Sequence, residues 1–340
     1  MTKFLLPFLV LFFLSCKESK KVNADTRHAL IANINYENSL LTYSYWKDEH
    51  YAIKIENLNN GKIIFSQKIK DNCFTEPRIK DERLYFPESN DIFTCLDYKT
   101  KKVIWKINTQ GRIRTFQFVS KNIIILSIDV YGLVAINIET GKVIYELLLH
   151  SDKNCTVDFA PNPIAFDEKN FYVVNFNCIS VAAYDIASGK SIWNKKEDSK
   201  ISNFIVNDQY VFIGSQFNNG KNELLLLEAK TGKEIFRNSS SFNIFIDPVV
   251  YKNKIYYQTE DSQLQEFDIE SKIIKSVFKT QSNLLGCSQM FQIGHYLYIQ
   301  DCDYNVNKID LQNSKREIVY KGQKGLLGVY KINNETKFIY

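Results

Sequence analysis

Short apolar runs separated by polar turns fill almost the whole chain after residue 28. In one representative stretch, the apolar run 204–206 is followed by the polar turn 207–209 and the aromatic-rich run 210–213. The same arrangement recurs at three other turns: Lys80-Asp81-Glu82, Asp167-Glu168-Lys169 and Tyr251-Lys252-Asn253. Runs of this length and composition predict β-strands joined as hairpins. No stretch keeps a helical period over three turns, so the pattern predicts an all-β fold.

A second hairpin, with a recognisable turn, follows each of the first kind. The turn opens with an acidic or amide residue, here called the anchor, and the anchors are spaced 40 to 48 residues apart: Asn57, Asp97, Asn137, Asp185, Glu228, Asp268 and Asp310. In six of the seven copies a lysine stands five positions after the anchor: Lys62, Lys102, Lys142, Lys190, Lys233 and Lys315. Each repeat therefore holds four short strands in about 40 residues, which is typical of one blade of a β-propeller.

The repeated residues have a structural explanation. The anchor can hydrogen-bond the backbone of the turn, the glycine supplies a positive φ, and the aromatic eight positions after the anchor is large enough to pack on a neighbouring sheet. We expect seven residues to define the blades in this way: Asp97, Trp105, Gly141, Asp185, Gly189, Trp193 and Gly232. The sixth and seventh copies carry Ser276 and Ile318 at the aromatic position, so we expect the pattern to decay toward the C-terminus.

Two other features of the turn have alternative interpretations. Where the glycine is replaced by Lys101, Lys272 or Ser314, the turn is expected to differ or to carry strain. The repeated lysines fit a solvated strand edge that discourages pairing between sheets, and a ring of lysines that binds a ligand is the alternative.

One blade cannot bury both of its faces, so the blades must close into a ring, and residues 28–340 are expected to form a single propeller domain. Seven anchors predict seven blades. The other hairpin occurs once more in the tail, residues 330–340. This tail either closes a seven-bladed ring or begins an incomplete eighth blade.

The first segment is an export signal. Lys3 precedes an apolar stretch of 11 residues, Phe4 to Leu14. This stretch is too short to cross a bilayer of about 30 Å, so residues 1–15 read as a signal peptide. Ser15-Cys16 resembles the lipobox of bacterial lipoproteins, in which Cys16 would carry the lipid anchor. Residues 16–27 resemble the charged tether that, in one group of Gram-negative bacteria, directs lipoproteins to the cell surface.

The repeated turn and aromatic resemble the pyrroloquinoline-quinone-type propeller repeat, most clearly in residues 185–193. This family includes quinone-dependent dehydrogenases and also cofactor-free lipoproteins, such as the propeller subunit of the outer-membrane protein assembly machinery. The dehydrogenases are much longer, and many have two adjacent cysteines beside the quinone. This sequence has no Cys-Cys pair. The resemblance therefore implies the non-catalytic branch, without a cofactor.

Composition adds two limits. The net charge of +5 is small and dispersed, so the sequence does not indicate a nucleic-acid partner. The four histidines stand singly, and no C-x-x-C, H-E-x-x-H or G-x-S-x-G motif occurs, so we expect no metal site and no catalytic residue.

The six cysteines after Cys16 fall as neighbours in the sequence. In an oxidising exported compartment the local pairs Cys73 and Cys95, Cys155 and Cys178, and Cys287 and Cys302 are disulfide candidates. Six cysteines allow 15 pairings, and free buried thiols are the alternative.

Two stretches interrupt the period of the repeat. One lies at 147–163 and includes Asp152, Lys153 and Asn154, and the other lies at 216–222. Insertions in repeat proteins map to loops that often bind partners, so residues 152–154 are a candidate partner loop. We expect a lipid-anchored, non-catalytic interaction or scaffold module of the outer membrane, on its periplasmic face or at the cell surface, with an envelope protein as its partner. The alternatives are a propeller that binds a small molecule or glycan, and a quinone-dependent oxidoreductase.

Overall fold

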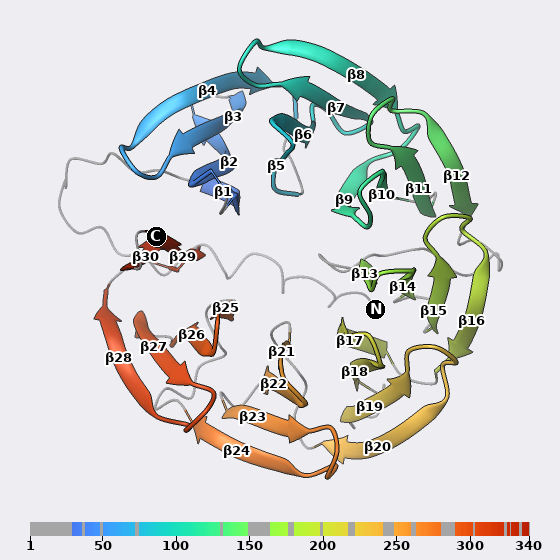
Figure 1. The fold of residues 1–340 in the computed structure, drawn as a ribbon, viewed down its shortest axis with the longest axis vertical. Coiled ribbons are helices and arrows are strands. Elements are labelled where there is room, and N and C mark those ends of the chain that lie inside the picture. The colour runs from blue at the N-terminus through green and yellow to red at the C-terminus, as the bar shows by residue number, and fades with distance from the viewer. Residues whose placement is uncertain are drawn as a thin grey trace, which may run out of the picture.

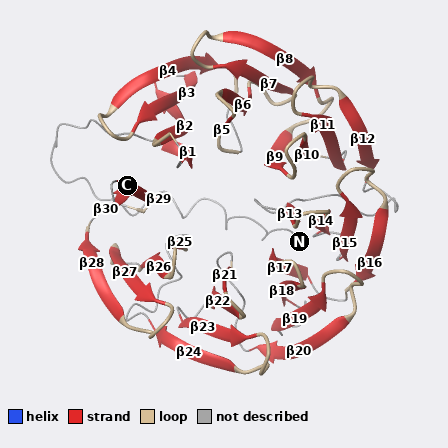
Figure 2. Cartoon of the chain, in the orientation of Figure 1, coloured by secondary structure: helices blue, strands red, loops and turns tan. Residues whose placement is uncertain are grey.

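The computed structural model is a ring of antiparallel β-sheets arranged around a central axis (Figure 1). It describes residues 29–35, 38–47, 50–71, 75–129, 132–148, 164–175, 180–197, 200–216, 222–240, 248–259, 263–279, 290–301, 303–322, 325–326, 328–332 and 335–339. Figure 2 shows strands and connecting turns throughout this part of the chain, and no helix within it. The predicted all-β propeller is confirmed.

Each of the first four sheets is a four-stranded blade, with its strands in chain order from the axis outward. Blade 1 contains β1 (Ala29–Asn35), β2 (Leu40–Lys47), β3 (His50–Asn57) and β4 (Lys62–Ile69). Blade 2 contains β5 (Arg78–Lys80), β6 (Arg83–Pro87), β7 (Ile92–Asp97) and β8 (Lys102–Asn108). Blade 3 contains β9 (Ile113–Phe118), β10 (Ile123–Ile128), β11 (Gly132–Asn137) and β12 (Val143–Leu148). Blade 4 contains β13 (Ile164–Phe166), β14 (Asn170–Asn175), β15 (Ser180–Asp185) and β16 (Ser191–Lys196).

The next three sheets repeat this plan, and the last sheet is shorter. Blade 5 contains β17 (Lys200–Val206), β18 (Tyr210–Gln216), β19 (Asn222–Glu228) and β20 (Glu234–Ser240). Blade 6 contains β21 (Val249–Tyr251), β22 (Lys254–Gln258), β23 (Gln263–Asp268) and β24 (Ile274–Lys279). Blade 7 contains β25 (Phe291–Ile293), β26 (Tyr296–Gln300), β27 (Asn305–Asp310) and β28 (Arg316–Lys321). The tail forms β29 (Gly328–Ile332) and β30 (Glu335–Ile339), here called half-blade 8.

The count of seven four-stranded blades is confirmed for the described residues. The tail does not pair with β1, because β29 and β30 form a two-stranded sheet of their own. This sheet lies in the ring between blade 7 and blade 1, as the alternative of an incomplete eighth blade expects (Figure 1).

The turns of each blade fall on two opposite faces of the ring. Because neighbouring strands are antiparallel, the first-to-second and third-to-fourth strand turns share one face, here called the turn face. The second-to-third and blade-to-blade connections join strand ends on the opposite, loop face. Both stretches that interrupt the repeat, 147–163 and 216–222, connect strand ends on the loop face.

A β-bulge interrupts the outermost strand in each of the seven blades, and it explains an error in the sequence pattern. One extra residue stands in the outermost strand at each bulge: Ile64, Ile104, Ile144, Ile192, Ile235, Val277 and Val319. An aromatic follows the extra residue each time, and in blades 6 and 7 it is Phe278 and Tyr320. The pattern therefore does not decay. In blades 6 and 7 the aromatic position is two residues further along the strand. Because side chains alternate along a strand, the aromatic side chain stays on the same face of the sheet.

Three of these aromatics join one blade to the next by the same contact. The indole Nε1 of Trp105 donates to the carbonyl of Ile138 in blade 3, at 3.0 Å. Tyr145 donates from its hydroxyl to the carbonyl of Ile186 in blade 4, and Trp193 donates from Nε1 to the carbonyl of Ala229 in blade 5, both at 2.8 Å. In each case the accepting carbonyl is one residue after an anchor.

The turn glycine of the next blade lies under each of these rings. A Cβ placed on Gly141 would lie 2.7 Å from the ring of Trp105, and one on Gly189 would lie 2.6 Å from that of Tyr145. The same contact joins Gly232 to the ring of Trp193, at 2.7 Å. A side chain at these turns would prevent the docking, so close approach of a ring requires glycine here.

The turns without glycine follow blades whose aromatic is phenylalanine. Lys101, Lys272 and Ser314 keep the left-handed conformation, with φ of 61°, 60° and 58°, so these turns carry strain and do not change shape. They follow the blades that carry Phe65, Phe236 and Phe278. Phenylalanine has no hydrogen-bond donor for the turn carbonyl. In the turns that follow these blades, a side chain is tolerated at the glycine position. Both observations indicate that the glycine serves the docked Trp or Tyr ring.

Candidate functional site

The sequence-predicted partner loop and lipidation site lie outside the described residues. This applies to Asp152, Lys153, Asn154 and Cys16. Of the disulfide candidates, Cys73, Cys155, Cys178, Cys287 and Cys302 also lie outside them.

Cys95 is the one disulfide candidate that lies among the described residues. It is a free thiol in the middle of β7, fully buried against Trp105 and Phe93 in the core between blades 2 and 3. Burial raises the pKa of this thiol to about 11. Cys73 lies outside the described residues, so the bridge from Cys95 to Cys73 stays a prediction.

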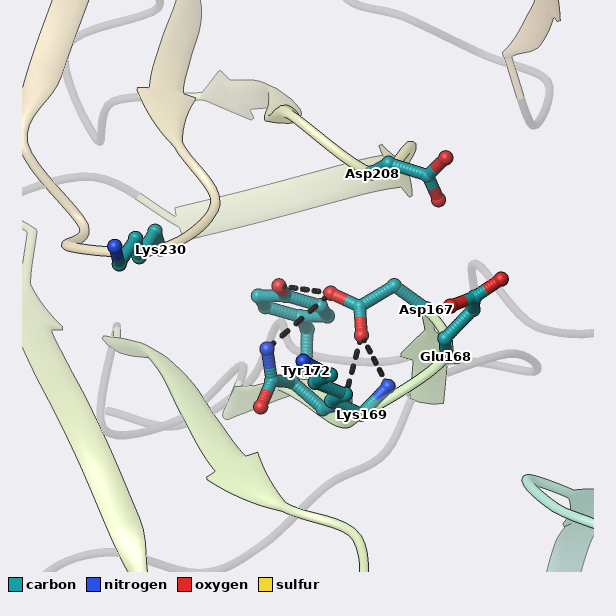
Figure 3. A pocket seen from close by; sticks show the side chains of 7 residues that line it. Asp167, Glu168, Lys169, Tyr172, Asp208 and Lys230 are labelled. Atoms are coloured by element: carbon teal, nitrogen blue, oxygen red, sulfur yellow. Dashed lines mark hydrogen bonds between the residues drawn. The ribbon is translucent and has the colours of Figure 1, made fainter.

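A pocket with a volume of about 490 Å³ opens on the turn face between blades 4 and 5 (Figure 3). The turn between β13 and β14 contributes Asp167, Glu168 and Lys169. Blade 5 contributes Asp208 from its β17–β18 turn and Lys230 from its β19–β20 turn. Residues of two neighbouring blades thus line one pocket.

Asp167 is the fixed point of this pocket. Its carboxylate accepts hydrogen bonds from the backbone N–H groups of Lys169 and Asn170, at 2.8 and 2.7 Å, and from the hydroxyl of Tyr172, at 2.6 Å. Burial opposes ionisation of Asp167, but these hydrogen bonds outweigh it and lower its pKa. Burial and the neighbouring Asp167 carboxylate both raise the pKa of Tyr172. These hydrogen bonds tie the Asp167 side chain to its own turn and to β14.

The rim of the pocket carries charges of both signs. Glu168, Asp208, Lys169 and Lys230 have exposed side chains. Such a rim can bind a polar or zwitterionic group by hydrogen bonds and ion pairs. The sequence pattern predicted residues 167–169 only as a hairpin turn. Asp208 and Lys230 lie beside the turn of blade 4 because blades 4 and 5 pack together. The sequence of a single repeat does not reveal this packing.

An ion-pair network joins the same two blades at the outer edge. Arg237 of β20 contacts Glu197, which follows β16, at 2.9 Å, and Glu223 of β19 at 2.5 Å. It also contacts Glu234 at 2.9 Å, and Lys195 of β16 lies 2.9 Å from Glu234. The Glu197 side chain is only 5% exposed, so removal of Arg237 would leave a buried carboxylate without this ion pair.

Replacing Arg237 with methionine is expected to lower the free energy of unfolding by about 2 kcal/mol, because it leaves the buried Glu197 carboxylate without its strongest partner. Urea unfolding followed by circular dichroism measures this loss. The control is Lys99→Met, which removes an exposed pair with Glu82 and should leave the free energy of unfolding nearly unchanged. Equal losses in the two variants would contradict the assignment.

The same network gives an expected pH dependence. The hydrogen bond from Arg237 lowers the pKa of Glu234 to about 2, from a usual value of 4.5. Because the folded pKa is the lower one, this stabilisation is present above pH 4.5 and is lost as the pH falls toward 2. The acid-induced loss of stability should be smaller in Arg237→Met.

The outermost strands carry most of the exposed large apolar side chains of the described residues. They lie on or beside these strands: Ile63, Ile64, Val103, Ile104, Val143, Ile144, Leu148, Ile192, Ile235, Ile273, Ile318 and Val319. The six repeated lysines are exposed at the start of the same strands, as a solvated edge requires. Bulges and lysines together make these edges poor templates for pairing.

Among the described residues, no group of three or more His, Cys, Asp or Glu side chains is arranged to hold a metal ion. In the same part of the chain, no helix has the length and apolarity needed to cross a membrane.

Comparison with known families decides the assignment. The family model described as outer membrane protein assembly factor BamB matches residues 47–220 and, in a second overlapping match, residues 180–317. The chain belongs to this BamB family. The matches cover more than half of the chain and confirm the resemblance drawn from the repeated turns.

Solved structures agree with the BamB family fold. The crystal structure of BamB from Moraxella catarrhalis is 14% identical, with a TM-score of 0.56, and the match covers 79% of this chain and 94% of that one. The computationally designed Ika8 protein is 12% identical, with a TM-score of 0.67 and coverage of 92% and 96%. Sqt1 from Saccharomyces cerevisiae is 9% identical, with a TM-score of 0.68 and coverage of 92% of each chain. At these identities the likeness shows the fold alone. A comparison with curated protein sequences gave no match.

Proposed function

We propose that this protein is a lipid-anchored, non-catalytic interaction module that takes part in assembling proteins of the outer membrane. The BamB family match over residues 47–317 carries the proposal. The match to an assembly factor, and not to a dehydrogenase, supports the non-catalytic form. The signal at 1–15 and the lipobox cysteine Cys16 support the location, with the anchor on the membrane and the ring facing the periplasm or the cell surface.

The loop face is the expected partner surface. The stretches 147–163 and 216–222 both connect strand ends on that face. A partner there would contact Asp152, Lys153 and Asn154. The remaining disulfide candidates, Cys155 with Cys178 and Cys287 with Cys302, stay predictions.

Crosslinking of intact cells, detergent extraction and mass spectrometry test this function. We expect an envelope protein to co-purify reproducibly, and its yield to fall at least tenfold when residues 149–163 are shortened. Cys16→Ser should release the protein from the membrane fraction, because no acyl chain can then be attached. Failure to recover any envelope partner would contradict the proposal.

A second function has one specific observation in its favour. The pocket between blades 4 and 5 is large enough for a small polar ligand such as a sugar, and its rim offers both carboxylates and amines. A ligand that binds there should raise the melting temperature of the wild type and not that of Asp208→Asn with Lys230→Met.

A further inference from the structure

Two exposed aromatic side chains lie on the loop face, one on each side of half-blade 8. Trp46 stands near the end of β2 in blade 1 and is 49% exposed, and Tyr304 stands between β26 and β27 in blade 7 and is 41% exposed. Both positions lie where a second strand turns into a third, so both belong to the loop face. Blades 1 and 7 are the two neighbours of half-blade 8 in the ring (Figure 1).

Tyr304 occupies a turn that disfavours a bulky residue. Its φ is +62°, a conformation that glycine or asparagine adopts with less strain. The backbone holds it there, since the N–H of Tyr304 donates to the carbonyl of Asp301 at 3.0 Å and the N–H of Gly322 donates to the carbonyl of Tyr304 at 3.3 Å. An exposed ring recovers little of this cost by packing. Strain of this kind persists where the side chain serves a function.

Trp46 differs from the other two tryptophans of the chain. Trp105 and Trp193 each donate from Nε1 to a carbonyl of the next blade. The ring of Trp46 lies 6.5 Å from that of Tyr51 in the neighbouring strand, and about half of the residue stays in solvent. Exposed apolar surface contributes nothing to the hydrophobic stabilisation of the fold, so a contact outside the ring explains this tryptophan better than the core does.

The chain enters the ring beside Trp46. Ala29 begins β1 and pairs with Tyr45, the residue before Trp46. Ala29 stands 13 positions after the expected lipidation site, Cys16. A fully extended chain of this length spans at most about 45 Å. A lipid on Cys16 therefore keeps the loop face of blade 1 close to the bilayer.

We propose that Trp46 and Tyr304 insert into the surface of the membrane that holds the lipid anchor, and that they turn the loop face toward this membrane. Indole and phenol rings suit the position, because each combines an apolar body with a polar group. Both are enriched where lipid headgroups meet the acyl chains. The inference rests on the proposed function for the lipid anchor and deepens it by giving the orientation of the ring.

The anchor makes two side chains sufficient. Membrane binding scales with the apolar area that is buried, so two rings alone would bind a bilayer only weakly from free solution. A short tether holds them beside the bilayer at a high effective concentration, and a weak contact then sets the orientation. The turn face, with its pocket between blades 4 and 5, points away from the membrane. A membrane-embedded partner would meet the loop face.

Quenching of tryptophan fluorescence by brominated lipids tests this orientation. The full chain, purified with its lipid in detergent, is reconstituted into vesicles of phosphatidylethanolamine and phosphatidylglycerol with or without bromine on the acyl chains. Bromine quenches a tryptophan by contact. We expect the emission of the wild type to fall in brominated vesicles and this loss to disappear in Trp46→Phe, which keeps Trp105 and Trp193 packed between blades as the background.

Two further variants, each built on Trp46→Phe, test the direction in which the ring faces. Tyr304→Trp should restore the quenching, because position 304 lies on the same face as position 46. The matched control is Phe166→Trp, since Phe166 is 41% exposed like Tyr304 but ends β13 on the turn face. A tryptophan at position 166 should stay unquenched. An unchanged melting temperature shows that each variant is folded.

Tyr304→Ser in the otherwise wild-type chain tests whether the two rings act together. We expect weaker quenching of Trp46 in this variant, because a single inserted ring leaves the loop face free to tilt. Quenching that is unchanged would contradict the joint role of Tyr304.

The other outcomes separate this inference from the proposed function. Equal quenching at positions 166 and 304, or no quenching of Trp46 in vesicle-bound protein, would overturn the orientation. An emission shift of Trp46 that follows protein concentration and not lipid would assign the aromatics to a second copy and overturn it as well. Envelope partners recovered despite such results would leave the proposed function standing. Quenching as expected without any cellular partner would support the orientation and contradict the interaction function. Failure of the purified chain to bind vesicles would contradict the lipid anchor and with it both proposals.

Discussion

Replacing Trp105 with alanine is expected to lower the free energy of unfolding by about 4 kcal/mol. This side chain is 8% exposed and lies in the core shared by blades 2 and 3, against Phe93 and Tyr85. Truncation removes the ring and its hydrogen bond to Ile138, and the rigid sheets on either side cannot collapse into the space. Urea unfolding followed by circular dichroism measures the loss.

Two further variants separate the contributions to this effect. Trp105→Phe keeps most of the ring and removes the donor, so it should cost only about 1 to 2 kcal/mol. Trp46→Ala removes a tryptophan that is 49% exposed and should cost less than about 1 kcal/mol. If Trp105→Ala and Trp46→Ala had equal effects, docking between blades would not be a major source of stability.

The second large effect is expected for Gly189→Ala, at about 3 kcal/mol. The new Cβ would meet the ring of Tyr145 at 2.6 Å, and alanine would also be held at φ of +68°. Tyr145 is half-buried, so overpacking of its ring is expected to cost about 1 to 3 kcal/mol, and the backbone strain about 1 kcal/mol more. The unfolding free energy from urea titration is again the measurement.

Gly61→Ala is the matched control for this prediction. Its φ is also +68°, but the atom nearest to the new Cβ is 4.0 Å away. Only the strain of about 1 kcal/mol should remain. The difference between the two variants is therefore the part that the docked ring imposes, and no difference would mean that glycine is retained in these turns for φ alone.

The repeated turns were sufficient to predict the fold. Anchors such as Asp97 and Asp185 accept backbone hydrogen bonds from the residues that follow, at 2.8 to 2.9 Å, as the sequence pattern requires. Four strands per repeat and seven repeats then leave a ring as the way to bury both faces of each sheet. The tail hairpin was also visible, since its alternation continues to residue 339.

Some residues could not be predicted from their distance to the anchor, because strand irregularities and blade packing change which residues meet. Phe278 and Tyr320 were missed because the bulge in the outermost strand moves by two residues in blades 6 and 7, and a fixed distance from the anchor does not follow that shift. The pocket near Asp167 was missed because it depends on how two blades pack.

The closure of the ring has a mechanical consequence. In many closed structures one sheet contains both ends of the chain and acts as a clasp. Here the described strands nearest the two ends, β1 and β30, belong to different sheets, so no strand pairing between these described strands joins the two ends. A force applied at the N-terminus would load the seam directly and peel blade 1 away as a first step. The ring should therefore open first at the contact between blade 1 and half-blade 8, before the other blades unfold.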